Sequence, residues 1–205
     1  MGKVDENKHQ KMDALFQSAY DLFLNQGIEK TSISDIAKKA GVAKGTFYLY
    51  FADKYEIRDR LIARTASRLF QRAHKALETA DIPEFEDKII FIVDYVLNAM
   101  QKNKLILRFI SKNLSWGIFR QAITNNTQDD EGEILAYFSN ILLDHPTIKL
   151  RAPETMLFLI IELASSTSYS TILDNDPMFE ELKPYLNESI RAIIRNHIIK
   201  DTAEN

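Results

Sequence analysis

The chain has 205 residues, of which 45% are hydrophobic, and it contains no cysteine. Its formal net charge is −3, with 26 Lys and Arg against 29 Asp and Glu, so composition alone does not indicate a nucleic-acid-binding protein. The lack of cysteine excludes disulfides and thiol chemistry, and no uninterrupted apolar run of membrane-spanning length or secretory leader is present, so we expect a soluble, cytoplasmic protein.

The first predicted helix follows a polar arm that ends near residue 8, and it closes at Gly27. Its apolar residues recur at helical spacing, which predicts one buried face. This helix supplies the third element that a small N-terminal domain needs for a core. The buried face is formed by Met12, Leu15, Phe16, Ala19, Leu22 and Phe23.

A short amphipathic helix is predicted next, from Ile33 to Ala40. Ser32 is a suitable N-cap, and Asp35 three residues later completes a capping box. Gly41 follows the last periodic residue, where the chain can turn through positive φ. The pattern predicts a tight corner between two helices.

The segment after this corner, residues 44–51, predicts a second short helix with an aromatic core face. Phe47 and Phe51 lie on one side, and the side chains between them point elsewhere. The tyrosines at 48 and 50 could instead fill a small core, but four aromatics within five residues exceed what one buried face can hold. We therefore interpret the pair of helices as a helix-turn-helix that reads DNA.

Each outward residue of the second helix has a chemical reason to contact DNA. Lys44 can bind a phosphate or the acceptors of guanine, Thr46 can contact a thymine methyl, and the tyrosine hydroxyls can donate to phosphates. Gly45 permits close approach of the backbone. No Arg precedes Arg58, so Lys44 is the only cation of this helix, and we expect modest specificity for each half-site. The predicted DNA-binding residues are Thr31, Ser32, Lys44, Gly45, Thr46, Tyr48, Leu49, Tyr50 and Lys54.

Residues 31–54 resemble the DNA-binding domain of the TetR family of bacterial transcriptional regulators. The segment departs from the family pattern at Tyr50, where a His is frequent, and at Ala52-Asp53. The resemblance covers about the first third of the chain in sequence, and the remainder only in its helical layout. The residues that carry it are Thr31 and Ser32, Ile36 and Ala37, Ala40 to Val42, Lys44 to Thr46, Phe47 to Phe51, and Lys54.

The remaining pattern is helical, and strand-type alternation is absent. We predict an all-α fold, with an N-terminal three-helix helix-turn-helix domain joined by a long helix to a helical ligand-binding and dimerisation body. The predicted domains are residues 8–68 and residues 69–205. Arg60, Arg64, Arg68 and Arg72 repeat along the long helix and predict a solvated face. The further helices are predicted at about 54–80, 85–102, 104–123, 131–144, 153–173 and 184–200.

An effector pocket is implied by the resemblance, in the middle of the helical body. Residues 89–100 and 105–119 are apolar almost all round, so their aromatics suit either a core or a pocket wall. Asp94 and Glu162 interrupt apolar runs, where a lone carboxylate is costly to bury. Each could anchor a ligand, pair with Arg108 or face solvent. The predicted pocket residues are Phe91, Asp94, Tyr95, Phe109, Trp116, Phe119 and Glu162.

The last two helices are the predicted dimer interface. In the family, the corresponding pair from each subunit forms a four-helix bundle. Pro184 is expected in the first turn of the final helix. Small residues at 164–168 allow close helix approach, although an intramolecular core helix would show the same apolar stripe. That stripe consists of Leu186, Ile190, Ile193 and Ile194.

Catalysis is the competing class of function. The four histidines, at 9, 74, 145 and 197, lack metal-ligand spacing, and no nucleophile or phosphate-loop motif is present. We therefore expect no enzyme, no metal and no cofactor. The resemblance implies a regulator, by default a repressor, that binds an inverted-repeat operator of double-stranded DNA as a homodimer and is released by a small-molecule effector. The alternative is a similar DNA-binding protein that a protein partner controls.

Overall fold

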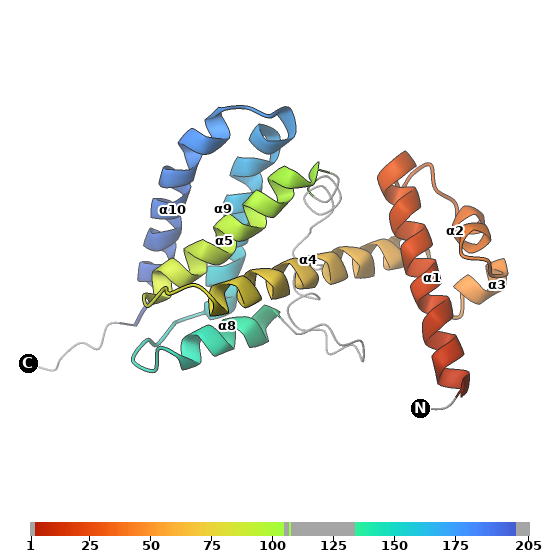
Figure 1. The fold of residues 1–205 in the computed structure, drawn as a ribbon, viewed down its shortest axis with the longest axis horizontal. Coiled ribbons are helices and arrows are strands. Elements are labelled where there is room, and N and C mark those ends of the chain that lie inside the picture. Colours follow the sequence, from red (N-terminus) through yellow and green to blue (C-terminus); the bar gives the residue numbers. More distant parts are fainter. Residues whose placement is uncertain (1–2, 105–106, 108–133, 200–205) are drawn as a thin grey trace, which may run out of the picture. The chain divides into compact units, whose positions relative to one another are not determined.

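A computed structural model describes residues 3–104, 107 and 134–199 of the chain (Figure 1). The described residues are helical apart from turns and one antiparallel bridge between Leu150 and Ile198, which confirms the predicted all-α fold. Contacts divide the chain into two compact units, Met1–Thr65 and Ala66–Asn205. The sequence placed its domain boundary between residues 68 and 69.

The first unit is built on a small aromatic core. Helix α1 packs on α2, and α2 packs on α3. The rings of Phe16 and Phe51 meet edge to face with centroids 5.1 Å apart, and Phe47 lies 5.4 Å from Phe51. Edge-to-face packing is a favourable arrangement for aromatic rings. The helices are α1 (Lys3–Gln26), α2 (Ile33–Lys39), α3 (Lys44–Phe47) and the first part of α4 (Lys54–Glu78).

The start of α2 has the predicted capping box. The backbone amide of Asp35 donates to Ser32 Oγ at 3.1 Å, and the amide of Ser32 donates to Asp35 Oδ2 at 3.0 Å. The hydroxyl and the backbone amide of Ser32 both donate to the Asp35 carboxylate, and these two hydrogen bonds lower the pKa of Asp35 below its ordinary value. The end of α1 is likewise as predicted, because Gly27 has φ of +83°.

The corner between α2 and α3 is a Schellman turn. Gly41 has φ of +70°, its amide donates to the Lys38 carbonyl, and the amide of Val42 donates to the Ala37 carbonyl at 3.0 Å. Helix α3 is shorter than predicted, because the regular helix ends at Phe47. Residues 48–50 form turns, in which the amides of Leu49 and Tyr50 donate to the carbonyls of Thr46 and Phe47. The recognition element is therefore one helical turn followed by a tighter turn.

The second unit is a helical bundle in which α5 lies beside α9 and α10 (Figure 1). Helix α10 packs most extensively on α9, and α5 also contacts α8. Antiparallel pairing joins the segment before α9 to the end of α10: the amide of Arg151 donates to the His197 carbonyl at 2.8 Å, and that of Ile199 to the Lys149 carbonyl at 2.8 Å. The helices are α5 (Phe85–Lys102), α8 (Ile134–Leu143), α9 (Pro153–Asp174) and α10 (Met178–His197), with the second part of α4.

The final helix begins earlier than predicted. It starts at Met178, where the backbone amide donates to Asp176 Oδ1 at 2.9 Å, and Pro184 therefore lies inside it. The sequence-based expectation of Pro184 in the first turn is wrong, because Asp176 and Pro177 already provide a helix start. Since proline has no N–H, the carbonyl of Glu180 lacks its partner four residues on. The helix predicted at 104–123 lies almost entirely outside the described residues.

Helix α9 is long and apolar enough that length and composition alone would allow it to cross a membrane. Its packing gives a different explanation for this hydrophobicity. Met156, Ile160 and Ile172 are buried against neighbouring helices, and α9 contacts both α5 and α10. One face of α9 is thus a core face, and 39% of its apolar stretch is buried.

Candidate nucleic-acid interface

The exposed surface of α3 and its following turn is the candidate interface. Tyr48 and Leu49 are 52% and 79% exposed, whereas Phe47 and Phe51 beneath them are buried. Lys44 at the start of α3 is also exposed. The buried phenylalanines thus support a surface that exposes the ammonium of Lys44, the phenol of Tyr48 and the apolar side chain of Leu49.

Gly45 leaves open space at the centre of this surface. A Cβ built at this position would have no atom of the protein within 4 Å. The glycine is therefore not required for packing inside the unit. Its lack of a side chain keeps the backbone of α3 accessible to a ligand that approaches closely.

Three further predicted DNA-binding residues are at least partly exposed. Thr46 and Tyr50 are half-buried, and the ring centroid of Tyr50 lies 6.4 Å from that of Phe51. Ser32 is exposed, and its hydroxyl donates to Asp35 Oδ2 at 2.6 Å as part of the cap. The cap leaves the Ser32 side chain at the surface while fixing its orientation.

Thr31 does not face outward. Its side chain is 1% exposed, and its hydroxyl donates to the Gly27 carbonyl at 2.8 Å and accepts from Gln26 Nε2 at 3.2 Å. The sequence-based placement of Thr31 on the contact surface is therefore corrected. A polar side chain next to a helix start can close the preceding loop as readily as it can contact a ligand, and here it closes the loop.

Lys54 is likewise placed differently from the exposed residues. Its side chain is 19% exposed, and Nζ lies 3.0 Å from the Ile28 carbonyl and 3.4 Å from each of the Glu29 and Thr31 carbonyls. The ammonium is thus directed toward the loop between α1 and α2. The sequence-based interpretation of Lys54 as a phosphate contact does not match this geometry.

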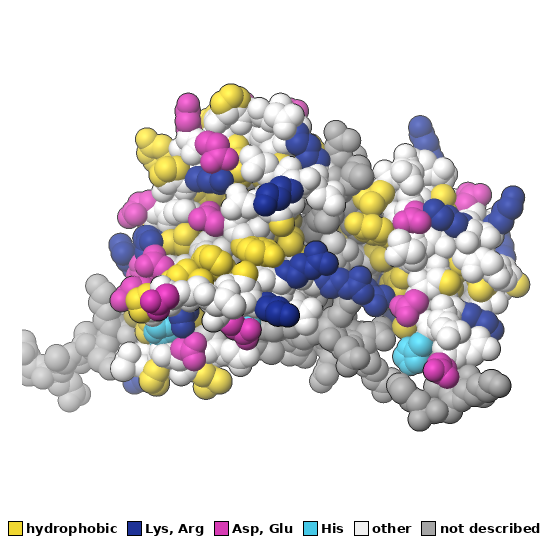
Figure 2. Space-filling model, in the orientation of Figure 1, with side chains coloured by type: hydrophobic (Ala, Val, Ile, Leu, Met, Phe, Trp, Pro, Cys, Tyr) yellow, Lys and Arg dark blue, Asp and Glu magenta, His cyan; other side chains and the backbone are white. Residues whose placement is uncertain are grey.

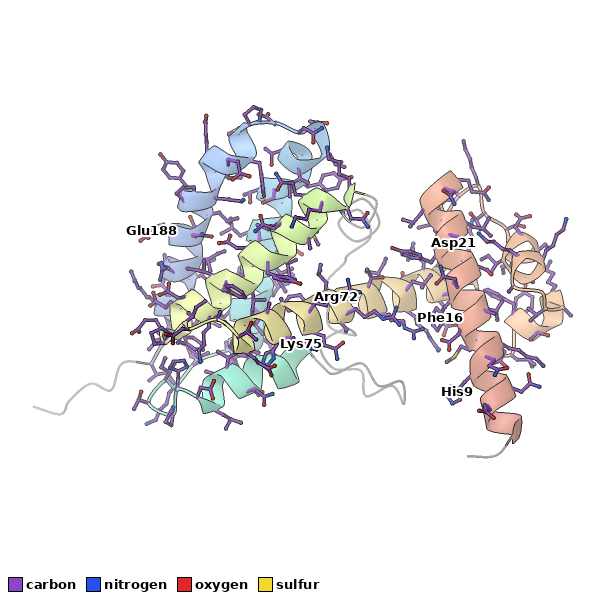
Figure 3. All side chains as sticks on the ribbon, viewed as in Figure 1. His9, Phe16, Asp21, Arg72, Lys75 and Glu188 are labelled. Atoms are coloured by element: carbon purple, nitrogen blue, oxygen red, sulfur yellow. The ribbon has the colours of Figure 1, made fainter. Side chains whose placement is uncertain are left out.

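Several acidic groups of the first unit are engaged as caps or ion pairs. Asp21, on α1 (Figure 3), accepts from Lys39 at 2.9 Å, and this hydrogen bond lowers the pKa of Asp21. Asp53 Oδ1 accepts the amides of Tyr55 and Glu56 at 2.8 Å each and so caps α4. These pairings reduce the repulsion that free carboxylates would exert on DNA phosphates.

Lys and Arg side chains gather along α4 (Figure 2). Two of its arginines are held by the first unit: Arg60 donates to Glu56 Oε1 at 2.6 Å, and Arg64 donates to Asp13 Oδ1 at 3.2 Å. Their guanidinium groups also lie over the Phe51 and Phe16 rings, at 5.3 and 5.4 Å from the centroids. Sequence reasoning did not single out Tyr55, which is exposed at the start of α4 with Lys54 and Arg58 over its ring.

The predicted effector residues are dispersed where the structure describes them. Phe91 and Tyr95 are half-buried neighbours on α5, with ring centroids 6.5 Å apart. Asp94 faces α10, where Asn187 Nδ2 donates to its Oδ2 at 3.3 Å, and Glu162 is exposed on α9. The expectation that Glu162 lines a pocket is corrected in favour of the solvent-facing alternative. Phe109, Trp116 and Phe119 lie outside the described residues.

Two adjoining cavities in the described part of the second unit involve other residues. An apolar cavity of about 40 Å³ lies between α4, α5, α8 and α9. A polar cleft of about 380 Å³ adjoins it and shares His74 and Ile141. The apolar cavity faces Ile89, Ile92 and Val93, which lie on a different face of α5 from Phe91 and Tyr95. Sequence periodicity could have found this face, because these three residues repeat at helical spacing.

The apolar stripe predicted for the dimer interface is buried within the chain. Leu186, Ile190 and Ile194 are buried core residues where α10 packs on α9 and α5, and Ile193 is half-buried. The assignment of this stripe to a dimer interface is therefore wrong, and the alternative of an intramolecular core is correct. The opposite face of α10 carries Glu188, which points away from α9 (Figure 3).

Within the described ranges, no three His, Cys, Asp or Glu side chains lie close enough together to hold a metal ion.

Comparison with known proteins identifies the first unit. Residues 15–61 match the family described as bacterial regulatory proteins, tetR family. YvdT, an uncharacterised helix-turn-helix transcriptional regulator of Bacillus subtilis, is 40% identical over 78 residues, which cover 36% of this chain and 39% of that protein.

Two further similarities extend over most of the chain. The fatty acid metabolism regulator protein of B. subtilis is 26% identical over 167 residues, covering 82% of each chain. The crystal structure of the transcriptional regulator FadR from B. subtilis, in complex with stearoyl-CoA, superposes with a TM-score of 0.57 at 19% identity over 87% of this chain and 97% of that chain. The chain thus carries, at residues 15–61, a helix-turn-helix domain of the tetR family of bacterial regulatory proteins, and over most of its length it is similar to transcriptional regulators.

Proposed function

We propose that this regulator is a repressor that binds an inverted-repeat operator as a homodimer and leaves it when a small-molecule effector binds to residues 66–205. The observation that carries the proposal is the exposed surface of α3, supported from beneath by Phe47 and Phe51. Because α3 has only four residues, one copy reaches few base edges. A second copy on a symmetric half-site supplies the remaining affinity.

In this proposal the α3 surface enters the major groove. Lys44 contacts a phosphate or a guanine, Tyr48 donates to a phosphate, and Leu49 packs against apolar base atoms. Gly45 allows the backbone to approach because its surroundings are open. Thr46, Tyr50 and Ser32 contribute further contacts.

The dimer is proposed to form through the outer faces of α9 and α10. Tyr185 is 74% exposed on α10, and Leu159 and Met178 are also exposed large apolar side chains. Ser166 and Ser170 on the exposed side of α9 are small enough for close helix approach. This face replaces the buried stripe in a four-helix bundle between two copies.

The effector is proposed to carry a polar head and an apolar tail. The polar cleft adjoins the apolar cavity, so one molecule could place each end in matching surroundings. The similarity to a fatty acid metabolism regulator and to a structure with stearoyl-CoA makes fatty acyl compounds the first class to test. The apolar cavity measures only about 40 Å³, so an acyl chain would require the surrounding helices to separate. Such a ligand binds two packings unequally, which is what allostery requires.

The test is selection of bound fragments from the source genome by the purified protein, with Lys44→Ala and Tyr48→Phe as variants. We expect an inverted repeat that both variants bind more weakly, and release of the wild-type protein by stearoyl-CoA. No enriched repeat with a folded dimeric protein would contradict operator binding. Enrichment that no acyl compound reverses would contradict the effector class and favour control by a protein partner.

A further inference from the structure

Lys54 holds a loop of the chain with all three donors of its ammonium. Nζ lies 3.0 Å from the Ile28 carbonyl and 3.4 Å from the carbonyls of Glu29 and Thr31. An ammonium group has three N–H donors and no acceptor, so these three carbonyls can satisfy it completely. The carboxylate of Glu29, 4.0 Å away, adds an ion pair at the exposed edge.

A phosphate contact would disturb this arrangement. To donate to a phosphate, the ammonium would have to release a carbonyl that is then left without its charged partner. Lys44 differs, because it is exposed at the start of α3. The two lysines therefore have different environments although both belong to the same sequence pattern.

We propose that Lys54 is a positioning residue of the DNA interface, which ties the start of α4 to the loop in front of α2 and does not itself neutralise a phosphate. The inference rests on the proposed DNA-binding function. Lys54 would affect the affinity for DNA indirectly, by orienting the helix-turn-helix.

Both ends of this connection are locally well fixed. On the loop side, Thr31 Oγ1 donates to the Gly27 carbonyl, and Ser32, the N-cap of α2, follows directly. On the helix side, Asp53 caps the first amides of α4. Because hydrogen bonds fix both the loop before α2 and the start of α4, a displacement of the start of α4 would also displace the start of α2.

The position of Lys54 in α4 gives the connection a regulatory role. Helix α4 runs continuously from Lys54 to Glu78, and the division between the two units falls within it. Lys54 is the first residue of α4, so a movement of α4 produced by an effector would reach the helix-turn-helix through Lys54. Loss of the lysine would therefore lower affinity for DNA and weaken the response to effector.

The salt dependence of operator binding separates positioning from phosphate contact. A lysine that neutralises a phosphate adds about 0.9 to the slope of log affinity against log salt, or about 1.8 for two half-sites. We expect Lys44→Met to reduce the slope by about that amount. Lys54→Met should weaken binding roughly 10-fold with the slope unchanged, as expected for a contact energy lost without a released counterion. A reduced slope in Lys54→Met, or unaltered affinity, would overturn the inference.

A second measurement uses the free protein and so does not depend on the operator. Hydrogen exchange of the backbone amides of α2 should be faster in Lys54→Met than in Lys44→Met, because only the former releases the loop before Ser32. Equal exchange in the two variants would overturn the proposal. If Lys54→Met does not fold, Lys54→Gln, which keeps two N–H donors, takes its place in both measurements and the same outcomes apply. Wild-type protein that binds no inverted repeat would instead contradict the proposed function, while the exchange result still decides the role of Lys54.

Discussion

Asn187 on α10 donates from Nδ2 to Oδ2 of Asp94 on α5 at 3.3 Å, and both Asp94 Oδ1 and the amide oxygen of Asn187 are buried without a hydrogen-bond partner. Two acceptors are thus enclosed beside a single donated hydrogen bond. Burial raises the pKa of Asp94 above its ordinary value of 3.8, and the Asn187 hydrogen bond and the nearby Lys183 only partly oppose this effect. A protonated Asp94 could donate to Asn187 and complete a reciprocal pair.

Asp94→Asn should stabilise the protein at neutral pH. The introduced amide has a donor for the unpartnered Asn187 oxygen and carries no charge to desolvate. We expect the free energy of unfolding to rise by about 1 kcal/mol, measured by urea denaturation. The matched variant Asp87→Asn should destabilise instead, because Asp87 forms an ion pair with Arg191. A destabilised Asp94→Asn would contradict this account of the pair.

The same carboxyl predicts a pH dependence with a definite sign. Because the pKa of Asp94 is higher in the folded state than in the unfolded state, the folded protein binds the proton more tightly, and stability falls as pH rises from about 3.8 through the folded pKa. Besides Lys183, Glu180 of α10 acts on Asp94, and it raises the pKa. Asp94→Asn should remove this component, so the difference in unfolding free energy between variant and wild type should grow from acid to neutral pH. A constant difference would show that Asp94 does not titrate in this way.

Ala152→Gly should stabilise the start of α9. Ala152 has φ of +45°, a left-handed conformation that costs a residue with a Cβ about 1 kcal/mol. Glycine adopts it freely, so we expect a gain of up to about 1 kcal/mol in unfolding free energy. Ala76→Gly is the matched control, because Ala76 lies inside α4, outside the proposed dimer interface of α9 and α10, and the same change there should cost about 1 kcal/mol. If both substitutions change the free energy of unfolding in the same direction, the left-handed backbone of Ala152 is not the source of the effect.

Tyr185→Lys should weaken the proposed dimer. The substitution places a charge on the exposed face of α10, where burial against a second copy would remove its hydration. We expect the dimer dissociation constant, measured by analytical ultracentrifugation, to rise roughly 10-fold or more. Leu143→Lys introduces the same charge at another exposed apolar residue, at the end of α8, and should leave dimerisation unchanged. A dimer insensitive to Tyr185→Lys would place the interface elsewhere.

Thr31→Val and Thr46→Val should distinguish a residue that stabilises the DNA-binding unit from one that contacts DNA. Thr31→Val removes the hydroxyl that donates to Gly27, so it should lower the unfolding free energy by about 1 kcal/mol and leave the preference for operator over random DNA unchanged. Thr46→Val should alter that preference with little loss of stability, because Thr46 is partly exposed on α3. Both quantities can be measured on the same preparations by thermal denaturation and competition binding. If Thr31→Val instead alters the preference for operator DNA and leaves stability unchanged, Thr31 belongs to the contact surface.

Local features of the DNA-binding unit followed from the sequence alone. The Ser32 and Asp35 capping box, the positive φ of Gly41 and the burial of Phe47 and Phe51 depend on groups a few residues apart. Short-range sterics and helical periodicity are sufficient to predict such features. The same holds for α5, whose predicted limits agree with the structure.

Only the tertiary structure decided what each helix face and polar group contacts. Periodicity found the stripe of α10 that includes Leu186 and Ile190, but it could not tell an intramolecular core from a dimer interface, since both bury the same face. Lys54 and its carbonyl partners lie more than twenty positions apart in sequence, and Asp94 and Asn187 lie still farther apart. Hydrogen-bond partners at such separations depend on how helices pack, because the packing sets which donors and acceptors meet away from water.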